Sequence, residues 1–177
     1  MGGNRKKRRT YPDVPERLAS AIVDNHTHLP VRGDRDYAAL SFDVASGVEE
    51  GADEDRQGSI PWHVARMEAA GVRCAITCGC DVPTLQPTVA LAERWPSLSA
   101  AIGIHPNEAP LHRGITEESP DGMAHGLDAW HRDLSLEDAV AEVAALAVSA
   151  DVVAIGETGL DFYRTAAAGR AAQEEAF

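Results

Sequence analysis

The sequence predicts an α/β protein: the first half of a TIM-like (β/α) barrel, with about four strand–helix units present. Short apolar runs without strict alternation each precede a segment with helical spacing, which is typical of parallel strands covered by helices on their outer side. An open doubly wound sheet fits this alternation too. Two further observations favour the barrel. No Gly-rich phosphate turn follows the first run, and polar residues gather just after the strand ends, where barrel enzymes place their sites.

Four apolar runs are expected to form the strands, at residues 21–24, 72–77, 98–104 and 152–156. A polar segment, 32–58, follows the first run and is interpreted as a long loop, with a mobile acidic part at 43–57. Ser59 then has the features of an N-cap, with Pro61 in the first turn of a helix. This first helix is expected to end near Gly71.

The later helices are predicted from the same kinds of signal. The spacing of apolar residues predicts a second helix over 84–95. An irregular stretch, 106–133, precedes a third helix that Ser135 opens, with Asp138 completing an approximate capping box. A fourth helical segment is expected at 168–177, with no helix stop after it. Since a barrel needs eight units and usually ~250 residues, we expect a truncated form of a longer protein.

The composition indicates one soluble globular domain, since 44% of the 177 residues are hydrophobic and 25% are charged. We expect a disordered basic tail at 1–19 and the amino-terminal part of a barrel domain at 20–177. Lys and Arg total 16 against 28 Asp and Glu, a formal charge of −12. Without the five basic residues at 5–9 the ratio is 11 to 28, or −17. This charge excludes phosphate binding by surface charge alone, and a nucleic-acid substrate would need bound cations.

Neither a membrane span nor a secretory signal is found in the sequence. The three cysteines are Cys74, Cys78 and Cys80, and the last two are too close for an unstrained disulfide. A reducing, cytoplasmic setting is therefore expected. The Cys-x-Cys pair is compatible with a soft metal, but buried thiols are the better interpretation because no second pair is present.

His26 and His28 directly follow the first apolar run. On a strand, residues i and i+2 point to the same side, so two imidazoles at this spacing converge where a metal ion could sit. Two surface or hydrogen-bonded histidines at a strand end are the alternative.

Glu157 comes directly after the fourth apolar run. A carboxylate at the end of an apolar strand needs a partner, because an unpaired buried charge costs several kcal/mol. A metal ion is one such partner, and the backbone amides of its own Gly-rich loop are another. Together with His26 and His28, Glu157 makes a His₂Glu set, which is known from catalytic zinc sites with an open position for water.

His105 follows the third strand and stands before Pro106. It is a candidate to contact substrate or to steer a proton, and a purely structural role is an equal alternative. The remaining histidines of the irregular stretch, His112, His125 and His131, are interpreted as solvated.

Three motifs taken together resemble the signatures of the TatD family, and 173–177 resembles the start of the helix that follows in that family. The motifs are Val23-Asp24-Asn25-His26-Thr27-His28, Gly103-Ile104-His105-Pro106 and Gly156-Glu157-Thr158-Gly159-Leu160-Asp161-Phe162-Tyr163. The resemblance covers residues 21–177 and implies a distorted (β/α)₈ barrel of the metal-dependent hydrolase type. Several members of the family cleave DNA phosphodiester bonds.

The resemblance implies roles for individual residues. His26 and His28 would bind the first of two divalent ions (Zn, Mg or Mn), Glu157 would bridge both, and a metal-activated water would attack DNA. No membrane or protein partner is indicated. The family's remaining ligands, two histidines and an aspartate, belong to a second half absent here. Asn25 and Thr158 replace the Ser and Cys frequent in the family, and 106–133 is longer than usual.

Two alternatives stay open at this point. The same barrel and metals could serve an amidohydrolase that acts on a cyclic amide or a lactone. The 177-residue chain could also be an inactive fragment.

Overall fold

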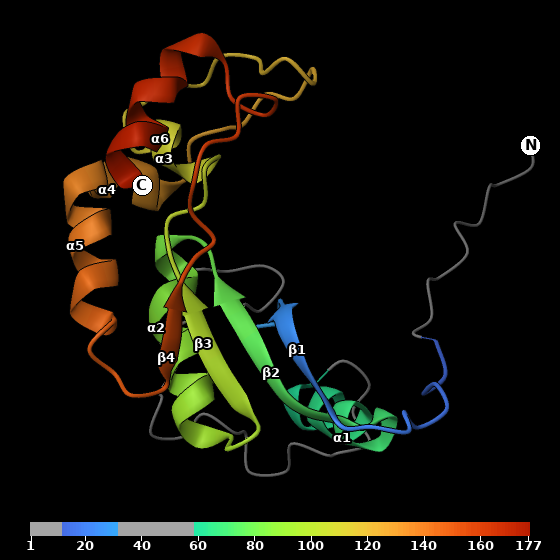
Figure 1. The fold of residues 1–177 in the computed structure, drawn as a ribbon. Helices are drawn as coiled ribbons and strands as arrows, with labels where there is room; N and C mark the ends of the chain where they lie inside the picture. Colours follow the sequence, from blue (N-terminus) through green and yellow to red (C-terminus); the bar gives the residue numbers. More distant parts are fainter. Residues whose placement is uncertain (1–11, 32–58) are drawn as a thin grey trace, which may run out of the picture.

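The computed structural model describes residues 12–31 and 59–177, and Figure 1 shows their arrangement. The expectations for the basic residues at 5–9 and for the acidic segment at 43–57 lie outside the described residues.

A parallel four-stranded sheet forms the centre of the described fold (Figure 1). Its strands are β1 (Ile22–Thr27), β2 (Val72–Gly79), β3 (Leu98–Ile102) and β4 (Val152–Ile155), each hydrogen-bonded to the next in the order β1-β2-β3-β4. All three pairings are parallel. The strands advance in one direction without the reversal that defines an open doubly wound sheet. The sheet is therefore that of a partial (β/α) barrel, as the sequence predicts.

Helices lie between successive strands and after the last described strand. They are α1 (Ile60–Ala70), α2 (Val82–Arg94), α3 (Glu108–Leu111), α4 (Ala129–Asp133), α5 (Leu136–Leu146), the 3₁₀ turn η2 (Ala167–Gly169) and α6 (Arg170–Ala176). The prediction that 106–133 is irregular throughout is wrong, because α3 and α4 lie within it. Both helices are four or five residues long, too short for a periodic pattern to be visible in the sequence.

The helix starts and stops follow from local sequence. The Ser59 hydroxyl accepts a hydrogen bond from the Trp62 backbone N–H at 3.3 Å, and Gly71 ends α1 with a φ of 90°, which a residue with a Cβ rarely adopts. Ser135 caps α5 by accepting from the Asp138 N–H at 3.1 Å. The predicted caps are confirmed at both positions.

The main core lies between the sheet and the helices on one of its faces. Leu85 and Val89 of α2 pack with Ile102 of β3 and Leu136 of α5, and all four are at most 2% exposed. A second cluster joins Val64 of α1 to Ala75 of β2 and Leu98 of β3. The described helices hold the strands from this face, and the carboxyl ends of the strands remain available for a site.

The opposite face and the edge strands carry exposed apolar side chains. Val23 on β1 is 46% exposed, and Val153 and Ile155 on β4 are 54% and 57% exposed. In the described part of the chain, β1 and β4 each pair with one strand only.

The segment 12–19 contains no helix or strand but lies against the end of α1. The Leu18 N–H donates to the Ala70 carbonyl at 3.0 Å, and the Arg17 guanidinium donates to the Glu68 carbonyl at 2.9 Å. The bond to Ala70 satisfies a carbonyl that the helix end leaves without an intrahelical partner, whereas the Glu68 carbonyl also accepts from the Gly71 N–H. The domain limits at 19 and 20 stay a prediction.

Candidate metal centre

The carboxyl ends of the strands are joined by backbone hydrogen bonds that continue beyond the sheet. Gly103 N–H donates to the Gly79 carbonyl at 3.0 Å, His105 N–H to the Cys80 carbonyl at 2.9 Å, and Gly156 N–H to the Ile102 carbonyl at 2.9 Å. The residues that follow β2, β3 and β4 therefore have defined positions. A Cβ on Gly103 would lie 3.0 Å from the Glu157 carbonyl oxygen, so the close approach of these two segments favours glycine.

The register of β1 changes just where the histidines stand. Asp24 is opposite Ala75 but Thr27 is opposite Thr77, so one more residue is inserted on β1 than on β2 between these pairs. Such an irregularity redirects side chains at a strand end. The His26 N–H donates to the Asp24 carboxylate at 3.1 Å. This bond fixes the backbone conformation at the register change.

The segment after His28 is anchored to β2. The Leu29 N–H donates to the hydroxyl of Thr77 at 3.2 Å, and Thr77 is 1% exposed. The two histidines thus stand between two fixed points, the Asp24 turn and the Thr77 hydroxyl.

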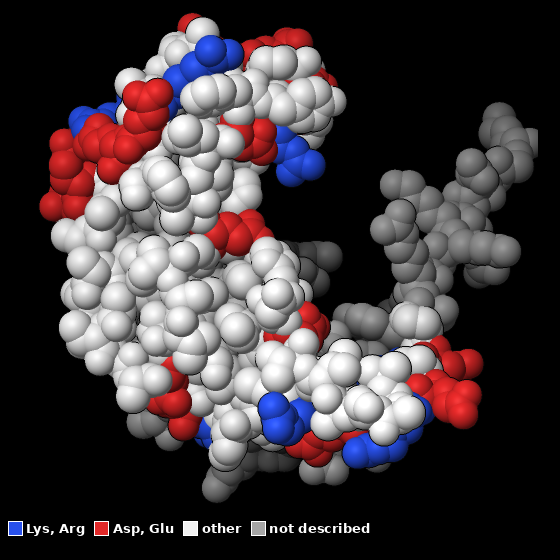
Figure 2. Space-filling view, viewed as in Figure 1, with Lys and Arg blue, Asp and Glu red and all other residues white. Residues whose placement is uncertain are grey.

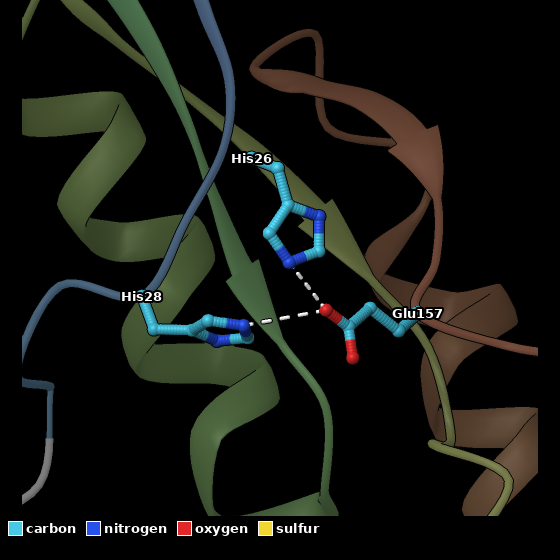
Figure 3. Close-up of side chains that lie close together, drawn as sticks. All are labelled: His26, His28 and Glu157. Atoms are coloured by element: carbon cyan, nitrogen blue, oxygen red, sulfur yellow. Dashed lines mark ion pairs between the residues drawn. The ribbon is translucent and has the colours of Figure 1, made fainter.

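His26, His28 and Glu157 converge from opposite edges of the sheet (Figure 3). The Nε2 atoms of His26 and His28 lie 2.5 Å and 3.3 Å from the same carboxylate oxygen, Oε1 of Glu157. One ligand atom from each residue lies within 4.8 Å of the others. The sequence prediction that these three groups face one another at the carboxyl ends of the strands agrees with this arrangement.

The three residues fit a divalent cation. Imidazole nitrogens and carboxylate oxygens are the donors that Zn²⁺ and related ions accept, and here they point to one place. Both histidine side chains are 54% exposed and Glu157 is 28% exposed, so the place is open to solvent and to a substrate. Figure 2 shows a hollow on this side of the molecule, above the strand ends that Figure 1 locates.

His105 contacts the other oxygen of the same carboxylate. Its Nδ1 accepts a hydrogen bond from the Asn107 N–H at 3.1 Å, so its proton sits on Nε2, which lies 3.2 Å from Oε2 of Glu157. Burial lowers the pKa of His105, and the negative charge of Glu157 opposes that effect. A neutral His105 that donates to Oε2 orients Glu157, in the way that histidine and carboxylate pairs support metal ligands.

Two thiols lie beside these residues. The Cys78 sulfur is 4.0 Å from Nδ1 of His26, and burial raises the pKa of this thiol. Burial also raises the pKa of Cys80 to about 12; a hydrogen bond with the Glu157 backbone opposes this rise, and the negative charge of the Glu157 carboxylate adds to it. Because only thiolates bind metals, a soft-metal site at these cysteines is disfavoured at neutral pH.

Gln173 was not singled out by its sequence, yet it joins two of the site loops. The side chain is 0% exposed. Its Oε1 accepts from the Asp161 N–H at 2.9 Å, while its Nε2 donates to the Pro106 carbonyl at 2.9 Å and to the Thr165 hydroxyl at 2.5 Å. The loop after Glu157 and the loop after His105 are therefore tied to α6 through one amide group. From helical periodicity alone, Gln173 cannot be distinguished from a solvent-exposed helix residue.

The expectation that His112 and His131 are solvated is wrong. They are 6% and 5% exposed, and their rings lie 5.0 Å apart. His131 Nε2 is 2.7 Å from a carboxylate oxygen of Glu108, and His112 Nδ1 is 3.0 Å from the Leu134 carbonyl. These contacts pack α3 against α4, which the sequence did not reveal as helices. His125 is half-buried.

Comparison with known proteins identifies the family of the chain. The family model described as "TatD related DNase" matches residues 23–177. The chain belongs to the TatD related DNase family. A protein named 3'-5' ssDNA/RNA exonuclease TatD from Cronobacter sakazakii is 31% identical over 137 residues, which are 77% of this chain and 41% of that protein.

Two further relatives carry the same name. The protein from Citrobacter rodentium is 32% identical over 114 residues, 64% of this chain and 34% of its own length. The protein from Salmonella typhimurium is 35% identical over 101 residues, 57% of this chain and 30% of its own length. The chain thus matches between three and four tenths of the length of these TatD relatives.

Proposed function

We propose that the protein hydrolyses phosphodiester bonds of DNA as a metal-dependent hydrolase of the TatD type. The observation that carries this proposal is the convergence of His26, His28 and Glu157 at the carboxyl ends of β1 and β4, in a chain of the TatD related DNase family. The relatives named 3'-5' ssDNA/RNA exonuclease support a nucleic-acid substrate.

The proposed cofactors are two divalent cations, Zn²⁺, Mg²⁺ or Mn²⁺. His26 and His28 would hold the first, and Glu157 would bridge both, since its two oxygens face different neighbours: Oε1 faces His26 and His28, and Oε2 faces His105. When bound, such ions lower the pKa of a water and neutralise phosphoryl oxygens. The acidic composition, −12 overall, makes this neutralisation necessary before a polyanion can approach.

The protein's own residues have distinct proposed roles. His105 orients the Glu157 carboxylate through its Nε2–H, so its role is positioning. Since Nδ1 of His105 accepts from the Asn107 N–H, the ring is neutral in this arrangement, with its proton on Nε2 facing Oε2 of Glu157. The lowered pKa of His105, caused by burial, favours this neutral form at pH 7.

We also propose a cytoplasmic location. The cysteines Cys74, Cys78 and Cys80 are all free thiols, as expected in a reducing compartment. Within residues 12–31 and 59–177, no helix combines the length and the apolar character needed to cross a bilayer.

The first prediction concerns metal binding, which is measured by thermal unfolding. At 100 times its dissociation constant a bound ion stabilises by roughly 2.7 kcal/mol, which corresponds to a rise of about 5–11 °C for a chain of this size. We expect this rise with Mn²⁺ or Zn²⁺ for the wild type and for Glu93→Gln, a control on the outer helix α2. Glu157→Gln should remove it.

Hydrolysis is measured on the same proteins with 5'-labelled single-stranded DNA that has a free 3' end and, separately, with a cyclic amide. The proposal expects metal-dependent shortening of DNA by the wild type and by Glu93→Gln, and its loss in Glu157→Gln. Metal binding with turnover of the cyclic amide alone would move the assignment to an amidohydrolase. Absence of both metal binding and turnover would contradict the proposal and favour an inactive fragment.

A further inference from the structure

Arg164 lies on the loop that Glu157 begins, and its backbone is held firmly. The Asp161 carboxylate accepts from the N–H groups of Tyr163 at 3.1 Å and Arg164 at 3.0 Å. Gln173 bonds Asp161 on one side of this turn and Thr165 on the other. The Cα of Arg164 therefore has a defined position relative to the metal-ligand candidates.

The guanidinium group of Arg164 is, in contrast, loosely held. The side chain is 56% exposed, and its contact with a carboxylate is 4.0 Å long, from Nε to Oδ2 of Asp121. The other oxygen of Asp121 accepts hydrogen bonds from Ser119 and from the Met123 N–H. Most of the guanidinium donors thus remain available for an external acceptor.

Two other arginines have guanidinium groups with well-defined partners. Arg113 is bonded to Glu137 at 2.9 Å and also to Glu175. Arg170 lies over the ring of Phe162 at 4.5 Å from its centre. Neither has the exposed, weakly paired arrangement of Arg164.

Arg164 also lies near the candidate metal centre. It lines a crevice together with Asn107, whose N–H donates to Nδ1 of His105 at 3.1 Å. Nε2 of the same His105 ring lies 3.2 Å from Oε2 of Glu157.

A nucleic acid at this centre presents more than one phosphate. The phosphate at the reacting bond would be neutralised by the metals, and its neighbours would face an acidic protein unless a cation meets them. A planar guanidinium binds a phosphate through two parallel hydrogen bonds, which also sets its orientation. Glu117 lines the same crevice, and Asp121 faces the guanidinium, so both reduce the local positive potential.

We propose that Arg164 binds a backbone phosphate of the substrate next to the phosphate at His26, His28 and Glu157, and so positions the strand for cleavage. This inference rests on the proposed function. Asp121 acts as a competing carboxylate that the phosphate displaces from Arg164. Arg164 is a substrate-binding residue with no part in bond breaking.

The test is binding of a fluorescein-labelled decathymidylate, followed by anisotropy at several salt concentrations in EDTA and in Ca²⁺. We expect Arg164→Gln to weaken binding about five- to tenfold and to reduce the slope of log K against log salt by about 0.7, the value of one phosphate contact on a single strand. Asp121→Asn should act in the opposite direction and strengthen binding about two- to threefold, because it removes a competing charge. Arg164→Lys should keep the salt slope.

Arg94→Gln, at an exposed arginine of α2, is the matched control and should leave affinity and slope unchanged. Thermal unfolding of each variant separates a binding effect from a folding effect. Wild-type affinity and slope in folded Arg164→Gln would overturn this inference and leave the proposed function intact. A wild-type protein that neither binds nor shortens DNA would overturn both.

Discussion

Gln173 is the residue whose substitution we expect to affect both stability and the metal centre. It is 0% exposed and pairs firmly with two backbone groups, the Asp161 N–H and the Pro106 carbonyl, each at 2.9 Å. Gln173→Ala would leave both without these partners. An unsatisfied buried group costs about 1–3 kcal/mol, so the free energy of unfolding should fall by roughly 2–6 kcal/mol. For a chain of this size that means a decrease of about 4–24 °C in the midpoint of thermal unfolding.

The isosteric variant Gln173→Glu tests the hydrogen-bond explanation against simple loss of volume. At pH 7 its carboxylate can accept from Asp161 but cannot donate to the Pro106 carbonyl, so it should also be destabilised. Burial raises the pKa of a carboxyl group, so the folded form would bind the proton more tightly than the unfolded chain does. Gln173→Glu should therefore regain stability as pH falls from 7 to 5.

The assay is urea unfolding followed by circular dichroism, with Mn²⁺ affinity measured on the same samples. Gln86→Ala, an exposed glutamine on α2, is the control and should change stability by less than about 0.5 kcal/mol. A Gln173→Ala protein as stable as this control would refute the reasoning. We also expect Gln173→Ala to weaken Mn²⁺ binding, because Gln173 holds the loop that follows Glu157. Unchanged Mn²⁺ affinity in a destabilised variant would refute this link between Gln173 and Glu157.

Two further predictions concern the packing around the site. Burial lowers the pKa of His112 from its ordinary value of 6.5, so its contribution to stability is complete above pH 6.5 and is lost as pH falls through the folded-state pKa. His112→Asn, which can still donate to the Leu134 carbonyl, should show a smaller loss of stability between pH 7 and 5 by urea unfolding, and an unchanged loss would contradict this. Gly79→Ala would place a Cβ 2.8 Å from Oγ1 of Thr88 and should cost about 1–3 kcal/mol, whereas Gly126→Ala, with open space around it, should be neutral by the same measurement.

Much of the site could be predicted from the sequence because its signals are local. The spacing of His26 and His28 on one strand, and the position of Glu157 at the end of an apolar run, depend on the period of a β-strand and on the direction of parallel strands. Helix caps such as Ser59 and Ser135 are equally local, since each involves a hydroxyl and a backbone group three residues away.

Contacts between distant segments could not be predicted in this way. The Glu108–His131 pair and the bond from Gln173 to Pro106 join residues that are 23 and 67 positions apart. A polar side chain has the same local pattern whether it is buried or solvated. The register change in β1 and the way His105 and Glu157 face each other likewise depend on how neighbouring strands align. The sequence by itself therefore determined the strand–helix order, the helix caps and the candidate ligands. Only the tertiary structure decided which polar groups are buried and which partners they have, because burial depends on packing between elements and not on any one of them.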